Sequence, residues 1–202
     1  MVMHRRAFVV GAAFVLVAAI AAACATGGGS TAPASVTRDE GLGAFETVRA
    51  VLQHPRCQNC HPPGDAPLQY DDGLPHGQLV TRGPEGKGVP GLECATCHRE
   101  TNPPDSYGPN QPPGAPNWHL PPAHTKMVFL GLSSSELCRM LKDPKNTGGK
   151  DLPALLEHVR SDPLVLWGWT PGVGRAPVSI PHAEFVRAFE RWLAAGAPCA
   201  GD

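Results

Sequence analysis

Apolar residues recur at helical spacing in two parts of the chain, before residue 55 and after residue 130. In the first part this spacing predicts a helix over 39–54. Pro55 should end that helix, because a proline disfavours the helical conformation of the residue before it. The apolar face of this helix consists of Phe45, Val48, Val51 and Leu52.

Three further helices are expected after residue 130. Ser133 and Glu136 have the spacing of a capping box, and Asp151 can cap a short helix. The last helix should begin near Ser179 and Pro181 and end before a glycine at residue 196. One face of it is apolar: Phe185, Phe189, Trp192 and Leu193.

The stretch between these parts has a different composition. Of the 68 residues in 55–122, 15 are proline and nine are glycine, and no apolar periodicity is present. We therefore predict a mainly α protein with long irregular Pro/Gly-rich loops. The apolar run 164–169 is compatible with one short strand. A loop of such length argues against a compact domain unless something other than secondary structure organises it.

The first 24 residues are typical of an export signal. Basic residues precede an apolar run at 7–20, about 14 residues long, which suits a signal peptide and is short for a membrane span. Small residues before Cys24 favour a lipoprotein signal with Cys24 lipidated. Simple cleavage before Cys24 and a retained anchor helix are the alternatives. We expect a signal peptide at 1–24, a flexible linker at 25–38 and a domain at 39–200.

Export places the protein in the periplasm, anchored to the membrane by lipid. Without Arg5 and Arg6, 15 basic residues face 18 acidic ones, and the basic residues form no run. This charge gives no electrostatic basis for binding nucleic acid. An oxidising compartment also makes free thiols unfavourable, so each of the seven cysteines should have a role.

The pattern C-x-x-C-H occurs twice, at 57–61 and at 94–98. In c-type haem attachment the two thiols add to the haem vinyl groups and the histidine binds the iron. The motifs thus predict two covalently bound c-type haems. Their attachment residues would be Cys57, Cys60, Cys94 and Cys97, and their proximal iron ligands His61 and His98.

Other chemistries fit these motifs less well. A zinc ribbon could use the four cysteines, but the gap between the pairs is longer than usual, and zinc does not explain a histidine after each pair. A thioredoxin-like C-x-x-C requires a βαβ context, which is absent from the sequence pattern. A zinc-binding exported protein remains the alternative.

The remaining two cysteines form one candidate pair. A Cys138–Cys199 disulfide would close a loop of about 60 residues and contribute about 4 kcal/mol by chain-entropy estimates. Two separately buried thiols are the alternative. Because short helices bury little area, the apolar faces of two haems are expected to complete the core. The haem-free polypeptide should then be largely unfolded.

The sixth iron ligands are less constrained by the sequence. His76, between the motifs, and Met127, after a proline-rich segment, are the favoured distal candidates. The other loop histidines are His54, whose role stays open, His119 and His124.

Other ionisable and sulfur-bearing residues have different expected roles. Met140 should pack in the core through the apolar face of its helix. His158 and His182 lie next to glutamates on helix faces where exposure to solvent is expected. Arg82 and Arg175, beside glycines, are possible partners of haem propionates or simply exposed.

Several segments of the chain resemble a group of bacterial dihaem c-type cytochrome proteins. The similar segments are HPRCQNCHPPGD, RGPEGKGVPGLECATCHRETN, PPGAPNWHLPP, LCRMLKDPKNTGG and LVLWGWTPGVGR, spread over about 42–199. Members are often labelled isoquinoline 1-oxidoreductase subunits. This resemblance implies a cytochrome c-like, haem-organised core and association with a molybdenum hydroxylase or another dehydrogenase. It also supports His76 and Met127 as distal ligands.

The expected function is electron transfer rather than catalysis. Two six-coordinate haems would carry electrons from a dehydrogenase or hydroxylase partner toward the respiratory chain. A dihaem peroxidase, which needs an open iron position, is the enzymatic alternative, and a haem-based sensor or docking subunit is a third. The segment 166–169 could be a docking patch for a partner or could pack against haem.

Overall fold

The computed structural model describes residues 35–202 and confirms that this part of the protein is mainly α with little sheet. The signal peptide, Cys24 and most of the linker expected from the sequence lie outside the described residues. The helices are α1 (Arg38–Leu52), α2 (Pro55–Gln58), α3 (Ser134–Lys142), α4 (Leu152–Ser161), α5 (Pro163–Leu166) and α6 (His182–Ala194). The strands are β1 (Leu68–Gln69), β2 (Leu74–Pro75), β3 (Gly88–Val89) and β4 (Leu92–Glu93).

Polar caps set most helix starts where the sequence places them. Ser133 and Glu136 form the expected capping box of α3, and the Asp151 carboxylate caps α4 by accepting from the Ala154 amide at 2.9 Å. The first helix begins earlier than expected, because Thr37 and Glu40 form another capping box. The α6 helix has no side-chain cap, so Ser179 does not serve that purpose.

The short strand considered for 164–169 is not formed. Asp162 caps this segment by accepting from the Leu164 amide at 2.8 Å, and Pro163 occupies the first helical position. Both features favour a helix start. The segment folds instead as α5 followed by a turn of 3₁₀ helix, Trp167–Trp169.

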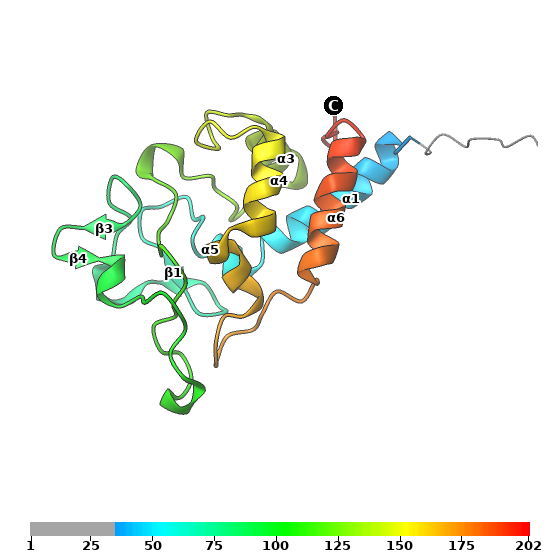
Figure 1. Ribbon diagram of the computed structural model, residues 1–202. Coiled ribbons are helices and arrows are strands. Elements are labelled where there is room, and N and C mark those ends of the chain that lie inside the picture. The colour runs from blue at the N-terminus through cyan, green and yellow to red at the C-terminus, as the bar shows by residue number, and fades with distance from the viewer. Residues whose placement is uncertain (1–34) are drawn as a thin grey trace, which may run out of the picture. The chain divides into compact units, whose positions relative to one another are not determined.

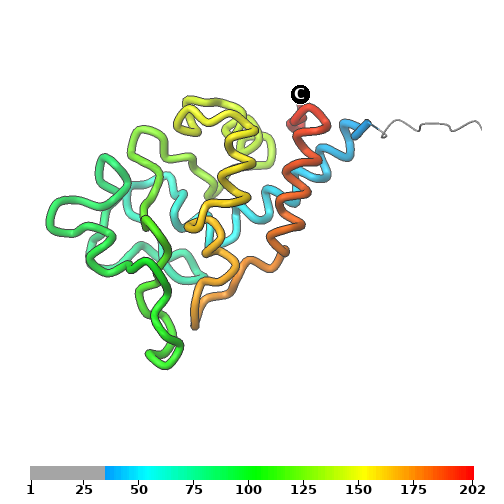
Figure 2. Tube along the Cα trace, viewed as in Figure 1, coloured from blue at the N-terminus to red at the C-terminus, as the bar shows by residue number. Residues whose placement is uncertain are grey.

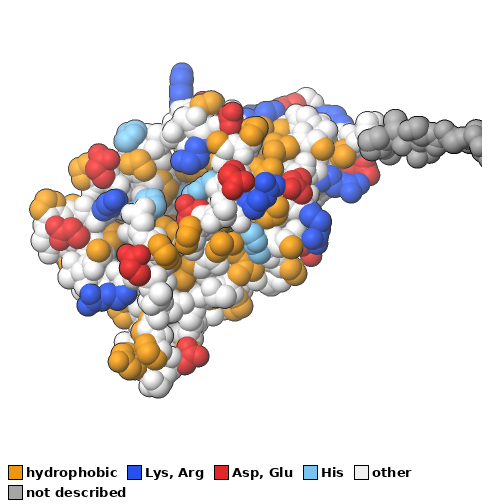
Figure 3. Space-filling view, in the orientation of Figure 1, with side chains coloured by type: hydrophobic (Ala, Val, Ile, Leu, Met, Phe, Trp, Pro, Cys, Tyr) orange, Lys and Arg blue, Asp and Glu red, His pale blue; other side chains and the backbone are white. Residues whose placement is uncertain are grey.

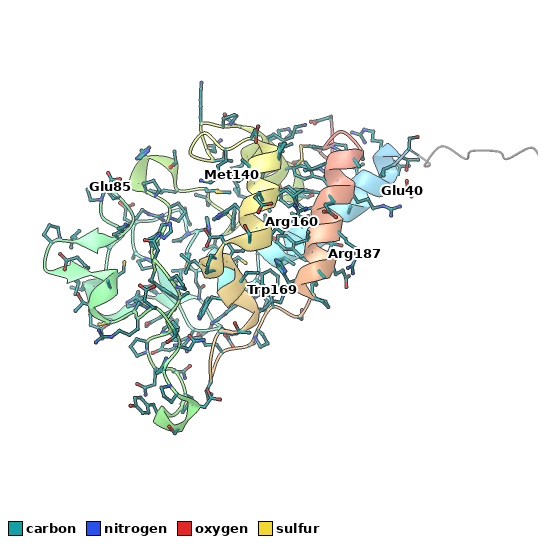
Figure 4. All side chains as sticks on the ribbon, viewed as in Figure 1. Glu40, Glu85, Met140, Arg160, Trp169 and Arg187 are labelled. Atoms are coloured by element: carbon teal, nitrogen blue, oxygen red, sulfur yellow. A yellow bond between two sulfur atoms is a disulfide. The ribbon has the colours of Figure 1, made fainter. Side chains whose placement is uncertain are left out.

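The larger helices form one half of the described molecule, which we call the helical half. Helices α1 and α6 lie side by side, with α3 and α4 next to them (Figures 1 and 2). A disulfide joins Cys138 of α3 to Cys199, which follows α6. On the outer side of this half, Arg160 of α4 reaches toward α6 and pairs with Glu190 at 2.6 Å (Figure 4). The fully buried side chains of its core include Phe45, Val48, Leu137, Leu155, Phe185, Phe189 and Trp192.

Residues 59–131 form the other half, which we call the loop half. Its regular structure is limited to two antiparallel hairpins, β1–β2 and β3–β4, and single turns of 3₁₀ helix. Close backbone approaches hold it together: a Cβ added at Gly86 would lie 1.8 Å from the Leu120 carbonyl oxygen. The sequence did not reveal these hairpins, because strands of two residues are too short to show alternation.

The surface shows no large patch of one charge on the face seen in Figure 3, where acidic and basic side chains are interspersed. Among residues 35–202, none of the helices is both long enough and apolar enough to cross a membrane.

Candidate haem-binding site

The first C-x-x-C-H motif lies directly after α1. Cys57 belongs to α2, and Cys60 and His61 form the turn that follows. His54 caps α2, because its Nδ1 accepts a hydrogen bond from the Arg56 amide at 3.2 Å. This contact gives His54 a structural role, which the sequence left open.

His61 is held by two contacts from a distant segment. Its Nδ1 lies 2.8 Å from the carbonyl oxygen of Met127, and its ring stacks on Phe129 with centroids 3.9 Å apart and planes 17° apart. The Phe129 amide in turn donates to the His61 carbonyl at 3.0 Å. Residues 66 positions along the chain therefore fix the ring of His61.

The second motif, on the 3₁₀ turn Cys94–Thr96, repeats this arrangement with different residues. The Nδ1 of His98 lies 2.8 Å from the Pro113 carbonyl oxygen, and its ring stacks on Trp118 at 4.3 Å with planes 4° apart. A glycine follows Pro113 because a Cβ at Gly114 would lie 2.0 Å from the Thr101 carbonyl oxygen.

These hydrogen bonds define the tautomer of both histidines. Because a carbonyl oxygen only accepts, each Nδ1 carries the hydrogen and each Nε2 keeps a free lone pair. Histidines that bind a metal usually donate their other ring nitrogen to a carbonyl or carboxylate in this way. Burial lowers the pKa of His61 to about 4 and also lowers the pKa of His98. Both rings are thus neutral at pH 7, as ligation requires.

Left-handed backbone concentrates around these residues. Seven non-glycine residues have a positive φ within 35–202. Four of them lie close in the sequence to a histidine or to a residue that contacts one. Gln78 and Leu79 follow His76 by two and three residues, Asn117 precedes Trp118, and Met127 itself has a φ of 52°. Such conformations cost on the order of 1 kcal/mol and cluster at functional sites.

A cavity of about 310 Å³ lies against the first motif. Ligand sites commonly have volumes of about 300–1,000 Å³. Cys57, Cys60 and His61 line one side of it. The other lining residues come from the loop 119–129 and from the helical half, and the apolar ones include Leu52, Phe129, Leu155, Val159, Trp167, Trp169, Phe185 and Phe189.

The segment 166–169 belongs to this cavity and is not an exposed docking patch. Trp167 is buried and donates from Nε1 to the Asn102 side-chain oxygen at 3.0 Å. Trp169, labelled in Figure 4, is half-buried and donates to the Ile180 carbonyl at 2.7 Å. Both indoles present their apolar surface to the cavity.

Arg56 supplies a buried positive charge at the same cavity. It is 6% exposed, and its Nη2 donates to the Tyr70 carbonyl and pairs with Asp71, while its Nε has no partner within residues 35–202. An unpartnered buried donor costs stability unless a ligand accepts from it. Asp71 already balances the charge of Arg56, and a haem propionate oxygen could accept from the Nε that has no partner.

The two arginines that the sequence singled out serve different purposes. Arg82 is fully buried and ties the loop half together by donating to the carbonyls of Pro121, Gly64 and Pro62. Arg175 donates to the Gln111 carbonyl. Neither residue lines the cavity of the first motif. Arg175 nevertheless lies near enough to His98 to lower its pKa, so its pairing with a propionate of the second haem stays a prediction.

The thiols of the first motif do not have the lowered pKa of reactive redox cysteines. Burial raises the pKa of Cys57 to about 12 and that of Cys60 to about 11. Within residues 35–202, no three His, Cys, Asp or Glu side chains are grouped so that they could hold a metal ion.

The second motif lies nearer the surface. Cys94 is buried but Cys97 is exposed. The ring of His76 lies 6.2 Å from that of His98, between centroids, and the planes are 61° apart. His76 Nδ1 donates to the Gly77 carbonyl at 2.9 Å, which leaves its Nε2 free as well.

Met127 lies beside the first motif, but on the side of His61 that faces away from Nε2. Its carbonyl oxygen accepts from Nδ1, so its main chain is behind the imidazole. Met127 also lines the cavity, and its role as a sixth iron ligand stays a prediction.

The remaining histidines include two, His158 and His182, that differ from the expected exposure to solvent. His119, His124 and His158 line the cavity, and His158 is half-buried rather than exposed. His182 is also half-buried, since its ring meets Trp169 at 4.7 Å and its Nε2 bonds to the Val159 carbonyl. Both exposure predictions were wrong because α4 and α6 turn these polar positions toward neighbouring segments. Met140 packs against the core, as expected.

An aromatic contact connects the two motifs. Trp118, stacked on His98, meets Trp167 edge-to-face with centroids 5.0 Å apart, and Trp167 lines the cavity of the first motif.

Comparison with family models, with curated proteins and with solved structures gives no match. The function has to be inferred from the motifs and their geometry.

Proposed function

We propose that this protein is a periplasmic dihaem c-type cytochrome that transfers electrons. The observation that supports this most strongly is the duplicated environment of the two motif histidines. Each has a free Nε2, an Nδ1 fixed by a carbonyl 2.8 Å away, and an aromatic ring stacked on it. Two unrelated segments supply these contacts, so a shared requirement at the histidine explains the repetition better than packing does.

The residues around each motif suit a haem. Cys57 and Cys60 would hold the first haem in the apolar cavity, with Arg56 beside its propionates and His61 on its iron. Cys94 and Cys97 would hold the second haem, with His98 on its iron. When bound, each haem would supply a one-electron Fe(III)/Fe(II) couple.

His76 is the sixth ligand of the second haem in this proposal. The rings of His76 and His98 lie 6.2 Å apart between centroids, and the Nδ1 of each is bonded to a carbonyl, which leaves both Nε2 atoms free. Both histidines would thus be available to hold the iron of the second haem. An iron held by two histidines would favour electron transfer over peroxidase chemistry.

The second site is the better candidate for electron exchange with a partner. Cys97 is exposed, whereas Cys57 and Cys60 are half-buried at the cavity. A haem bound at Cys97 would reach the surface with one edge. The partner would be a dehydrogenase, and the sequence resemblance suggests a molybdenum hydroxylase. A lipid on Cys24 would keep both haems at the membrane, near a respiratory acceptor.

The test is to produce the exported protein in cells that attach c-type haem and to measure its intact mass, spin state and peroxide turnover. We expect the mass of the polypeptide plus two haems, low-spin iron at both centres and no peroxide turnover. The Cys57→Ser/Cys60→Ser and Cys94→Ser/Cys97→Ser variants should each lose one haem. Absence of covalent haem, or a high-spin centre that consumes peroxide, would contradict the proposal.

A further inference from the structure

One wall of the cavity at the first C-x-x-C-H motif has no role in the proposed function. Helix α4 contributes Leu155, His158 and Val159 to this wall, and Asp162 at its end contributes too. Leu155 and Val159 are buried in the core, so the helix is anchored on both sides of His158. A side chain on such a helix is more rigidly placed than one on a loop.

His158 is oriented by a carboxylate. Its Nδ1 lies 3.2 Å from an Asp162 carboxylate oxygen, and both side chains are about one-third exposed, at 32% and 31%. The other Asp162 oxygen accepts from the Leu164 amide at 2.8 Å, so the start of α5 holds the carboxylate in place. The Nε2 of His158 has no hydrogen-bond partner among residues 35–202. A carboxylate on Nδ1 with a free Nε2 is the arrangement found behind many metal-ligating histidines.

We infer that His158 is the sixth ligand of the first haem and that Asp162 positions it; this inference rests on the proposed function. His61 and His158 line the same cavity, and they come from different walls of it, the loop half and helix α4.

The other candidates in the cavity are less suitable. Met127 is bonded through its carbonyl to the rear of His61. His124 is exposed, on a single 3₁₀ turn. His119 has a free Nε2 and a bond from Nδ1 to the Asn117 carbonyl at 2.5 Å, but it belongs to an irregular loop and has no carboxylate behind it. His119 is therefore the matched control for His158.

The test uses the full-length dihaem protein and optical and EPR spectra of its oxidised form. In His158→Ala, half of the haem iron should change from low-spin to high-spin, and added imidazole should restore the low-spin signal. His119→Ala and Met127→Leu should stay fully low-spin. A structural role for His158 would not be rescued by imidazole. An unchanged spectrum for His158→Ala, or a high-spin half in either control, would overturn the inference.

Two further variants keep the test decisive if His158→Ala does not fold. His158→Met should remain low-spin and raise the reduction potential of one haem, because a thioether favours the reduced iron. Asp162→Asn retains the helix cap but removes the carboxylate, so it should raise that potential without changing the spin state. Unchanged potentials in both variants would also overturn the inference.

The intact mass of the parent protein distinguishes a failure of the ligand assignment from a failure of the proposed function. Two attached haems with a spectrum insensitive to His158 would refute only the ligand assignment. A parent protein without covalent haem would refute the proposed function itself.

Discussion

The two C-x-x-C-H motifs resemble each other at the histidine and differ in almost everything around it. His61 and His98 have the same hydrogen bond and the same stacking partner type. The first motif, however, faces a cavity lined by the helical half, whereas the second lies in the loop half with Cys97 exposed. In the proposed dihaem protein, the local motif would specify attachment, while the surroundings would decide burial, the distal ligand and access to partners.

The largest difference should appear when each haem is removed in turn. The first haem would fill a cavity of about 310 Å³ whose walls include core residues such as Phe185 and Phe189, so its removal would expose that apolar wall to water. Cys57→Ser/Cys60→Ser should therefore show the larger decrease in Tm, measured by circular dichroism. Cys94→Ser/Cys97→Ser should show a smaller decrease. Equal losses in the two variants would remove the distinction between the sites.

Removal of the Cys138–Cys199 disulfide should show whether the stability of the helical half affects the first site more than the second. Cys138→Ala/Cys199→Ala should lose about 4 kcal/mol in the free energy of unfolding, because the closed loop spans 61 residues. Denaturant titration measures this loss. Since both cysteines lie in the helical half, the spectrum of the first haem should respond before that of the second as denaturant is added. Simultaneous responses would mean that the halves unfold as one unit.

The stacked aromatic rings should have smaller and comparable effects at the two sites. Phe129→Leu and Trp118→Leu each remove a ring stacked on a proximal histidine, an interaction of about 1 kcal/mol. In each variant we expect a small decrease in Tm and a broadened EPR signal of the adjacent haem alone. The matched control is Phe45→Leu, a core substitution away from the cavity lining that removes a ring packed on Trp192 and should leave both EPR signals sharp.

The smallest effect on stability is expected for the distal ligand of the second site. His76→Met should raise the potential of one haem by on the order of 0.1 V, because methionine favours the reduced iron. Thermal stability should hardly change, since His76 lies in a loop with few buried neighbours. A spectroelectrochemical titration that shows no shift would indicate that His76 is not an iron ligand.

The expectation that the haem-free polypeptide is largely unfolded needs refinement. Helices α1, α3, α4 and α6 share a core whose members include Phe45, Leu137, Phe189 and Trp192, and the disulfide closes it. The loop half has no comparable apolar core and depends on close backbone contacts and on Arg82. Without haem, order should therefore persist longest in the helical half.

Much of the helical half was predictable because its determinants are local. Capping residues and apolar spacing predicted α1, α3, α4 and α6, whereas α2 fell in a stretch expected to be irregular and the run 164–169, considered as a short strand, is helical. The two-residue strands and the loop contacts were not predictable, since a hairpin of that length has no pattern along the chain. Arg56 and His158 were missed as cavity residues because segments far apart in the sequence assemble the cavity.

The sequence by itself determined the two C-x-x-C-H motifs with their histidines and the main helices, and it offered Cys138 and Cys199 as one candidate pair. These features depend on neighbours within a few residues or on the number of cysteines. Only the tertiary structure decided that Met127 and Phe129 contact His61, that Pro113 and Trp118 contact His98, and that α4 contributes His158 to the cavity that His61 also lines. Those contacts join segments up to about 100 residues apart, and their geometry follows from the packing of the two halves.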